Sequence, residues 1–355
     1  MEDISMKKLL SLSLCMGAAA LAAAPLNPEI VKKEVKIVRR PAMVSVIGSS
    51  LQQLPPDGKT DVDTMIEFWT TRMDREVVTK PDLIVLPEIC DMWAGFKTAE
   101  EKHLWLEKRG DKILNAFREY AKKHKTYVIY PTYRQLGNRR YQNSAFVIDR
   151  DGDVVGRYDK LRPTVRDIAF GTIPGKAPVA VDTDFGRIAM LICFDLNFWE
   201  LLDSYVALKP DILLFSSYYH GDFMLKVWAY KCRAHLVAST IGHLPKEIVS
   251  PCGTTLRLEE DYEWTISEPI NTNCKVVHLD FNREGIQAAR AKYGRKIKMD
   301  SAGSVGAVTL YSEDPNLLID DVLKEFKIEL WDDYYNRSVK ACDEAIRTAP
   351  DAAWK

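Results

Sequence analysis

The chain has 355 residues, with 49 lysines and arginines against 50 aspartates and glutamates, so its formal net charge is −1. Hydrophobic residues make up 46% and charged residues 28% of the chain, which is typical of a globular protein and excludes a disordered or collagen-like one. Because the chain has no excess of cations to neutralise phosphates, we expect no nucleic acid among its partners.

The first 24 residues have the pattern of a secretory signal peptide. Lys7 and Lys8 precede an apolar run from Leu9 to Ala24 that ends in alanines, the order of segments that export signals use. This run is shorter than the roughly 20 residues that a spanning helix needs. Cys15 follows a leucine where a lipoprotein signal has a small residue, so we expect no stable membrane anchor. We predict a signal peptide over 1–24 and a periplasmic or extracellular protein; a buried N-terminal helix is the alternative.

After this segment, apolar runs rich in β-branched residues alternate with amphipathic helical stretches. The pattern predicts helices over 61–78, 99–123, 197–208 and 222–235. It predicts strands over 42–48, 83–86, 126–130, 142–148, 154–158, 179–181, 187–193, 212–215 and 236–241. The Asp149–Asp153 segment between two of these strands has the composition of a hairpin turn. This alternation predicts mixed α/β sheets covered by helices.

No repeat or low-complexity linker divides the middle of the chain, so we predict one domain over 33–312. An acidic C-terminal extension over 313–355 follows it, with two amphipathic helices over 317–326 and 328–347. We expect these helices to pack on the core or on a second subunit, because their apolar residues recur at helical spacing.

The cysteines and histidines lack the spacing of metal ligands. Six cysteines follow the predicted signal and are scattered without a C-x-x-C pair: Cys90, Cys193, Cys232, Cys252, Cys274 and Cys342. Neither zinc-binding nor thioredoxin-like motifs are therefore predicted, and we expect no metal and no cofactor. One or two disulfides remain open in an oxidising compartment.

Three apolar strands each end in one reactive side chain. The strand from Leu83 ends in the carboxylate of Glu88, another ends in the amine of Lys160, and a third ends in the thiol of Cys193. In open α/β sheets, catalytic groups collect where strands give way to loops. A thiol, a carboxylate and an ammonium group together suit attack on a carbonyl-like carbon. Taken singly, each residue has a bland alternative as a small core residue, a strand end or a solvated turn.

Around these residues the chain resembles the nitrilase superfamily of carbon–nitrogen hydrolases, in its amidase-like branch. The superfamily's Glu, Lys and Cys triad occurs in this order, and the matching segments are LPEICDMW, YDKLRPT and LICFDLNFWE. YQNSAFVID, FGTIPG, KPDILLFSS, KCRAHLVAST and SPCGTTL are similar to further family segments. The resemblance covers roughly 44–279. It implies an α/β fold, a four-layer α-β-β-α sandwich, that forms a homodimer or higher homo-oligomer.

The resemblance also implies roles for the triad residues. Glu88 would be the general base, Cys193 the nucleophile that forms a thioester, and Lys160 the cation above the substrate oxygen. The backbone N–H of Phe194 would assist Lys160 in the oxyanion hole.

Four further residues fall where family members build the rest of the site. Family members often carry a second glutamate four residues before the glycine that corresponds to Gly171, and this chain has Asp167 there. Asp167 is therefore a possible second acid, with a surface loop aspartate as the alternative. Tyr218, Tyr219 and His220 lie in the loop that lines the pocket in the family, and the tyrosines can either stack on a flat substrate or simply pack.

The residues after the nucleophile bear on the substrate. Nitrile-hydrolysing relatives tend to have Trp-Glu there, whereas this chain has Phe194-Asp195, closer to the amidase and carbamoyl branches and to secreted vanin- and biotinidase-like amidases. We therefore expect a small-molecule amide or N-carbamoyl substrate. Three alternatives stay open: acyl transfer from the same thioester to an amine, a catalytically silent secreted binding protein with the same sandwich, and a papain-like pairing of Cys193 with His220 or His235.

Overall fold

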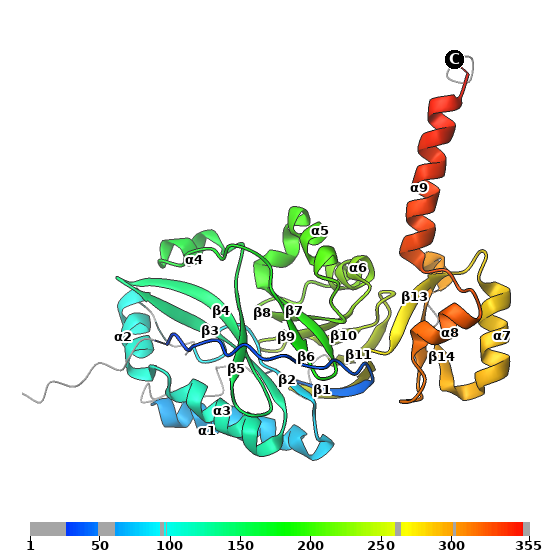
Figure 1. Ribbon diagram of the computed structural model, residues 1–355. Coiled ribbons are helices and arrows are strands. Elements are labelled where there is room, and N and C mark those ends of the chain that lie inside the picture. The colour runs from blue at the N-terminus through cyan, green and yellow to red at the C-terminus, as the bar shows by residue number, and fades with distance from the viewer. Residues whose placement is uncertain are drawn as a thin grey trace, which may run out of the picture.

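The computed structural model describes residues 26–48, 61–92, 96, 98–259, 264–300 and 303–350. Its main body consists of two six-stranded sheets packed face to face, with helices on the outer face of each (Figure 1). The signal peptide predicted over 1–24 lies outside the described residues.

The first sheet has the strand order β12-β1-β2-β3-β4-β5. Its strands are β1 (Pro41–Ile47), β2 (Leu83–Val85), β3 (Tyr127–Gly137), β4 (Arg140–Ile148), β5 (Val154–Asp159) and β12 (Thr265–Asn271). β1, β2 and β3 run parallel, whereas β3, β4 and β5 form antiparallel hairpins. The predicted turn over Asp149–Asp153 connects β4 and β5.

The second sheet repeats this plan with the strand order β11-β10-β9-β8-β7-β6. Its strands are β6 (Ala180–Thr183), β7 (Gly186–Ile192), β8 (Ile212–Ser217), β9 (His235–Thr240), β10 (Lys246–Val249) and β11 (Thr255–Glu259). β7, β8 and β9 run parallel in its centre.

Alternating side chains of the strands hold the four layers together. In β2, Leu83 and Val85 lie in the core between the sheets, whereas Ile84 lies in a second core with α1 (Val62–Glu76) and α3 (Lys112–His124). A strand that is buried on both faces in this way is apolar throughout, which explains why residues 83–86 read Leu-Ile-Val-Leu. On the other sheet, α5 (Trp199–Leu208) and α6 (Phe223–Cys232) contribute Tyr205, Leu225 and Trp228 to the core.

Two predicted helices end earlier in the structure than their sequence patterns indicate. The stretch predicted as one helix over 99–123 is α2 (Ala99–Arg109) followed by α3, because Gly110 adopts a φ of 51° that ends α2. α6 ends at Cys232, because Arg233 takes the left-handed conformation with a φ of 54°. In both places one backbone angle outweighs the helical periodicity of the side chains.

A third, smaller sheet with the order β13-β15-β14 builds a C-terminal unit. Its elements are β13 (Cys274–His278), α7 (Arg283–Tyr293), β14 (Ile297–Met299), β15 (Ala307–Ser312) and α8 (Ile319–Glu325). Val277 and Leu310 of this sheet share one core with Val322 of α8. The boundary predicted at residue 313 falls inside this unit, because the helix after it packs on strands before it.

The C-terminal helix α9 (Trp331–Thr348) confirms the predicted helical extension and projects away from the body (Figure 1). None of its residues is buried, and Tyr335, Val339 and Ile346 expose between 41% and 59% of their surface. Within the described ranges, no helix has the length and hydropathy that crossing a bilayer requires.

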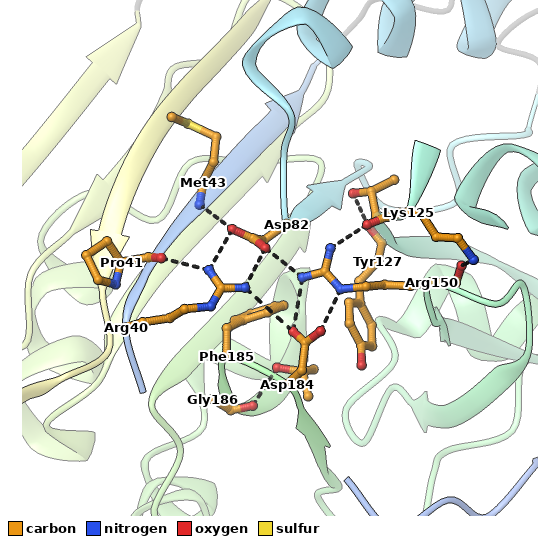
Figure 2. Close-up of polar contacts among 12 residues, drawn as sticks. Arg40, Pro41, Met43, Asp82, Lys125, Tyr127, Arg150, Asp184, Phe185 and Gly186 are labelled. Atoms are coloured by element: carbon orange, nitrogen blue, oxygen red, sulfur yellow. Dashed lines mark hydrogen bonds and ion pairs between the residues drawn. The ribbon is translucent and has the colours of Figure 1, made fainter. Parts of the chain in front are cut away.

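An ion-pair network connects the two large sheets (Figure 2). Asp82 precedes β2 of the first sheet, and Asp184 lies in the turn between β6 and β7 of the second. Arg150 lies 2.6 Å from Asp82 and 2.7 Å from Asp184. Arg40 contacts the same two aspartates at 2.8 Å and 3.9 Å. The network therefore connects the two sheets at the end of the sandwich where β1, β2 and β7 begin.

Candidate functional site

Glu88 and Lys160 form a buried ion pair at the ends of β2 and β5. They expose only 3% and 2% of their surface, and Lys160 Nζ lies 2.8 Å from Glu88 Oε1. Asn143 of β4 donates to the same oxygen from Nδ2 at 2.7 Å. The second oxygen, Oε2, is buried and has no hydrogen-bond partner among the described residues. One oxygen of the carboxylate is thus held in place while the other is available.

Cys193 follows β7 and opens a short 3₁₀ helix, η3 (Cys193–Asn197). Its φ of 49° places it in the left-handed region, a strained conformation for a residue with a side chain. Tyr219 supports this turn, because its hydroxyl donates to the Cys193 carbonyl oxygen at 3.1 Å and accepts from Asn197 Nδ2 at 2.8 Å. Tyr219 therefore contacts the backbone of the cysteine turn.

The charges of Glu88 and Lys160 both affect the pKa of the Cys193 thiol. Burial and then the negative charge of Glu88 raise the pKa of the Cys193 thiol to about 12, whereas the charge of Lys160 lowers it. Burial lowers the pKa of Lys160, but the attraction of Glu88, Cys193 and Asp167 outweighs burial, so the net shift is upward. The thiol is therefore protonated at neutral pH and needs a base to become a nucleophile.

Asp167 lies beside this cluster and is not a solvated loop residue. It belongs to α4 (Val165–Ala169), its side chain is 19% exposed, and its Oδ2 lies 3.5 Å from Lys160 Nζ. The Tyr133 hydroxyl donates to Oδ1 at 3.3 Å, and Thr164 N donates to Oδ2 at 3.0 Å. The structure thus places the Asp167 carboxylate beside Lys160.

The other predicted pocket residues occupy different surroundings. Phe194 is 38% exposed and packs edge-to-face on Phe198 at 5.2 Å. Tyr218 exposes 42% of its surface, but burial of its hydroxyl end and the charge of Glu88 raise its pKa. His220 Nε2 lies 3.1 Å from Glu247 Oε2 of β10. Phe194 and Tyr218 therefore combine exposure with proximity to the cluster, whereas His220 is held by another carboxylate.

His220 and His235, the two histidines considered for a papain-like pairing with Cys193, contact other residues. His235 lies in β9, is 1% exposed, and its ring contacts that of Tyr311 on β15 at 6.1 Å between centroids. Burial lowers the pKa of His235 to about 4. His220 pairs with Glu247, as described above.

Two further residues of the site, Asn143 and Asp195, belong to the matched motifs, but the sequence did not predict their contacts with the site. Asn143 is a buried polar residue of β4, but Gln142 and Ser144 beside it are polar as well, so its polarity alone does not single it out in the sequence. Asp195 stands two residues after Cys193 and is fully buried. It accepts hydrogen bonds from the Tyr158 hydroxyl at 2.6 Å, Arg162 N at 2.7 Å and Ile192 N at 3.1 Å.

Sequence comparison identifies the family. The model of the carbon–nitrogen hydrolase family matches residues 50–241, more than half of the chain. The chain is 30% identical over 125 residues to a hydrolase in the agr operon of Staphylococcus lugdunensis, over 34% of this chain and 52% of that protein. It is 35% identical over 102 residues to apolipoprotein N-acyltransferase of Geobacter metallireducens, over 24% of this chain and 20% of that protein. The chain thus spans between a fifth and about half of these relatives.

Solved structures share the fold. An amidase from Nesterenkonia sp. aligns with a TM-score of 0.56 at 14% identity, over 68% of this chain and 94% of that one. A carbon–nitrogen hydrolase from Helicobacter pylori G27 aligns with a TM-score of 0.56 at 18% identity, over 66% and 90%. In a glutamate-to-glutamine mutant of the Nesterenkonia amidase (TM-score 0.53, 14% identity, 68% and 94% coverage), the acetamide moiety of fluoroacetamide is covalently added at the active site cysteine. The predicted fold and the nitrilase-superfamily resemblance are confirmed.

Proposed function

Because the chain belongs to the carbon–nitrogen hydrolase family, we propose that it hydrolyses an amide or N-carbamoyl carbon–nitrogen bond through a thioester on Cys193. One observation carries this proposal: the buried Glu88–Lys160 pair leaves Glu88 Oε2 free in the same cluster as the thiol. The products are the free acid and ammonia or an amine.

In the acylation half, Glu88 Oε2 takes the proton of Cys193 as the sulfur attacks the substrate carbon. The C–N bond of the tetrahedral intermediate then breaks, and the proton passes from Glu88 to the leaving nitrogen. A base is needed at this step, because burial and the Glu88 charge keep the thiol protonated.

In the deacylation half, Glu88 takes a proton from a water molecule, and the resulting hydroxide attacks the thioester carbon. The C–S bond breaks, the acid leaves, and the proton returns to the sulfur. Lys160 and the backbone N–H of Phe194 stabilise the oxyanion in both halves. Asp167 is the second acidic residue of the proposed site: its carboxylate, 3.5 Å from Lys160 Nζ, keeps that lysine charged and oriented.

The substrate class rests on the sequence after the nucleophile and on the structural neighbours. Phe194-Asp195 stands where nitrile-hydrolysing relatives tend to have Trp-Glu, and the Nesterenkonia neighbour is an amidase. Phe194 and Tyr218 are partly exposed beside the cluster, which suits contact with an apolar or flat part of the substrate.

The proposal is tested by screening amides, ureido acids and nitriles for ammonia release with the wild type and Cys193→Ala. We expect turnover of amides or ureido acids by the wild type only. Full activity of a folded Cys193→Ala protein would refute the mechanism, and activity on nitriles alone would refute the substrate class.

Acyl transfer is a second candidate, supported by the 35% identity to an apolipoprotein N-acyltransferase over 102 residues. Adding hydroxylamine to the assay separates the two reactions. A hydrolase gives mainly the free acid without it, whereas a transferase releases ammonia only when an amine acceptor is present.

We also propose that the protein is exported and homo-oligomeric. Export is supported by the basic and apolar segments before residue 25, and sequencing of the mature N-terminus tests it. Self-association is supported by exposed apolar side chains on α5, α6 and α9, which are Trp199, Phe223, Tyr335 and Ile346. Light scattering after size-exclusion chromatography gives the mass of the assembly, and a monomer at all concentrations would contradict this proposal.

A further inference from the structure

The carboxylate of Asp195 joins the turn that carries Lys160 to the turn that carries Cys193. Oδ1 accepts from the backbone N–H of Arg162, two residues after Lys160, at 2.7 Å. Oδ2 accepts from the backbone N–H of Ile192, directly before Cys193, at 3.1 Å. One side chain therefore bridges the ends of β5 and β7, which belong to different sheets.

A third contact attaches the same carboxylate to β5 itself. The Tyr158 hydroxyl donates to Asp195 Oδ2 at 2.6 Å, and Tyr158 lies two residues before Lys160. Both side chains are fully buried. Hydrogen bonds from the β5 side and from the β7 side therefore fix the position of the Asp195 carboxylate.

Burying the Asp195 carboxylate costs free energy, because its charged form loses contact with water. Desolvation raises the pKa of Asp195 to about 6, although the hydrogen bonds from Tyr158, Arg162 and Ile192 and the charge of Lys160 act in the opposite direction. Tyr205 of α5 and Tyr219 after β8 also lie close enough to Asp195 for its negative charge to raise their pKa values. An apolar residue at such a position would avoid the desolvation penalty, so a role in the site accounts for the aspartate better than stability does.

We propose that Asp195 is a positioning residue that holds the Cys193 sulfur in line with Glu88 and Lys160 by bridging their turns. This inference rests on the function proposed above. Cys193 has a left-handed φ of 49°, and such a conformation persists only where neighbouring contacts enforce it. Asp195 enforces it from the N–H before the cysteine, and Tyr219 from the carbonyl of the cysteine.

Asp195→Asn tests the bridge with almost no change in volume. A carboxamide has one acceptor oxygen, so it can keep only one of the two backbone contacts, and its NH₂ group opposes the other N–H. Because small misplacement of a reacting group is costly, we expect kcat to fall by about 10–100-fold with KM nearly unchanged. Unchanged kcat in a folded Asp195→Asn protein would overturn the inference.

Tyr158→Phe is the matched variant, because it removes the third contact and keeps both backbone contacts. We expect kcat to be retained well above the pKa of Asp195. Since the Tyr158 hydrogen bond lowers that pKa, its loss shifts the acid limb of kcat to higher pH. An acid limb that does not move overturns the inference, and this second measurement decides the matter if Asp195→Asn does not fold.

Thr183→Val controls for lost stability alone, because it deletes a buried hydrogen bond from Thr183 to the Gly186 carbonyl at 2.6 Å in the β6–β7 hairpin. A comparable fall in kcat for this variant would also overturn the inference. Cys193→Ala separates the two proposals. If it is fully active, the proposed function fails; if it is inactive while Asp195→Asn is fully active, only the positioning role fails.

Discussion

Lys160 Nζ lies 2.8 Å from Glu88 Oε1 and leaves Glu88 Oε2 without a partner among the described residues. This arrangement divides the carboxylate into an oxygen that is fixed by the lysine and by Asn143 and an oxygen that can exchange protons. The same lysine remains charged, so it can stabilise negative charge on a substrate oxygen. The proposed base and the proposed oxyanion cation are therefore a single buried unit.

Glu88→Gln separates catalysis from thiol ionisation. We expect turnover to fall by about 10²–10⁴-fold, because the general base is lost. Since the charge of Glu88 raises the pKa of Cys193, its removal lowers that pKa from about 12. The pH dependence of Cys193 alkylation by iodoacetamide measures this, and a midpoint that stays or rises would contradict the assigned coupling.

Lys160→Met removes the cation next to the proposed oxyanion. We expect kcat/KM to fall by about 10²–10³-fold, the usual cost of one oxyanion donor. Lys33→Met is the control, because Lys33 Nζ also forms ion pairs, at 2.6 to 3.3 Å, but with Asp149, Asp151 and Asp153 in the turn between β4 and β5. Steady-state kinetics of both variants make the comparison, and equal losses would mean that the effect is not specific to the site.

Asp82→Asn weakens the network between the two sheets. Asp82 pairs with Arg40 and Arg150 and also accepts from Met43 N at 3.0 Å. Because both partly buried guanidinium groups lose the charge of one of the two aspartates that they share, we expect the free energy of unfolding to fall by about 2–3 kcal/mol. Urea denaturation measures the change. Asp151→Asn serves as the control, because Asp151 forms its ion pairs at the surface, and an equal loss there would contradict the account.

His235 makes the fold sensitive to acid. Burial lowers its pKa from 6.5 to about 4, so between these values the unfolded chain binds a proton that the native state does not. The free energy of unfolding therefore falls as the pH falls from 6.5 toward 4. A shift of this size corresponds to about 3 kcal/mol. His235→Phe should remove that part of the pH dependence. The raised pKa of Asp195 has the opposite effect on the free energy of unfolding over the same pH range. The contribution of His235 is therefore the difference in the free energy of unfolding between the wild type and His235→Phe, measured by urea denaturation at each pH.

The strand ends that carry Glu88 and Cys193 could be located from the sequence, because β2 and β7 are apolar runs that are almost entirely buried. β5, which leads to Lys160, alternates buried and half-buried residues instead. The resemblance extended this to Asp167, which lies beside Lys160 in the structure. The three strand ends belong to two sheets, β2 and β5 to one and β7 to the other, so bringing them together also depends on how the two sheets pack.

Other features depend on geometry that no local pattern records. The break at Gly110 follows from one backbone angle. The bridging role of Asp195 depends on two N–H groups from different sheets. The C-terminal unit begins at β13, because Val277 packs against a helix that lies more than 40 residues later in the chain, α8 (Ile319–Glu325). Such long-range contacts become visible only when the chain is folded.

Rapid acid quenching of the wild type during turnover of a small amide, followed by peptide mapping with mass spectrometry, tests the thioester directly. We predict an acyl group on the peptide that contains Cys193, with no such adduct in Cys193→Ala. An acyl group found instead on Cys90 or Cys232, or turnover without any adduct on Cys193 under conditions that trap a thioester, would contradict the proposed mechanism.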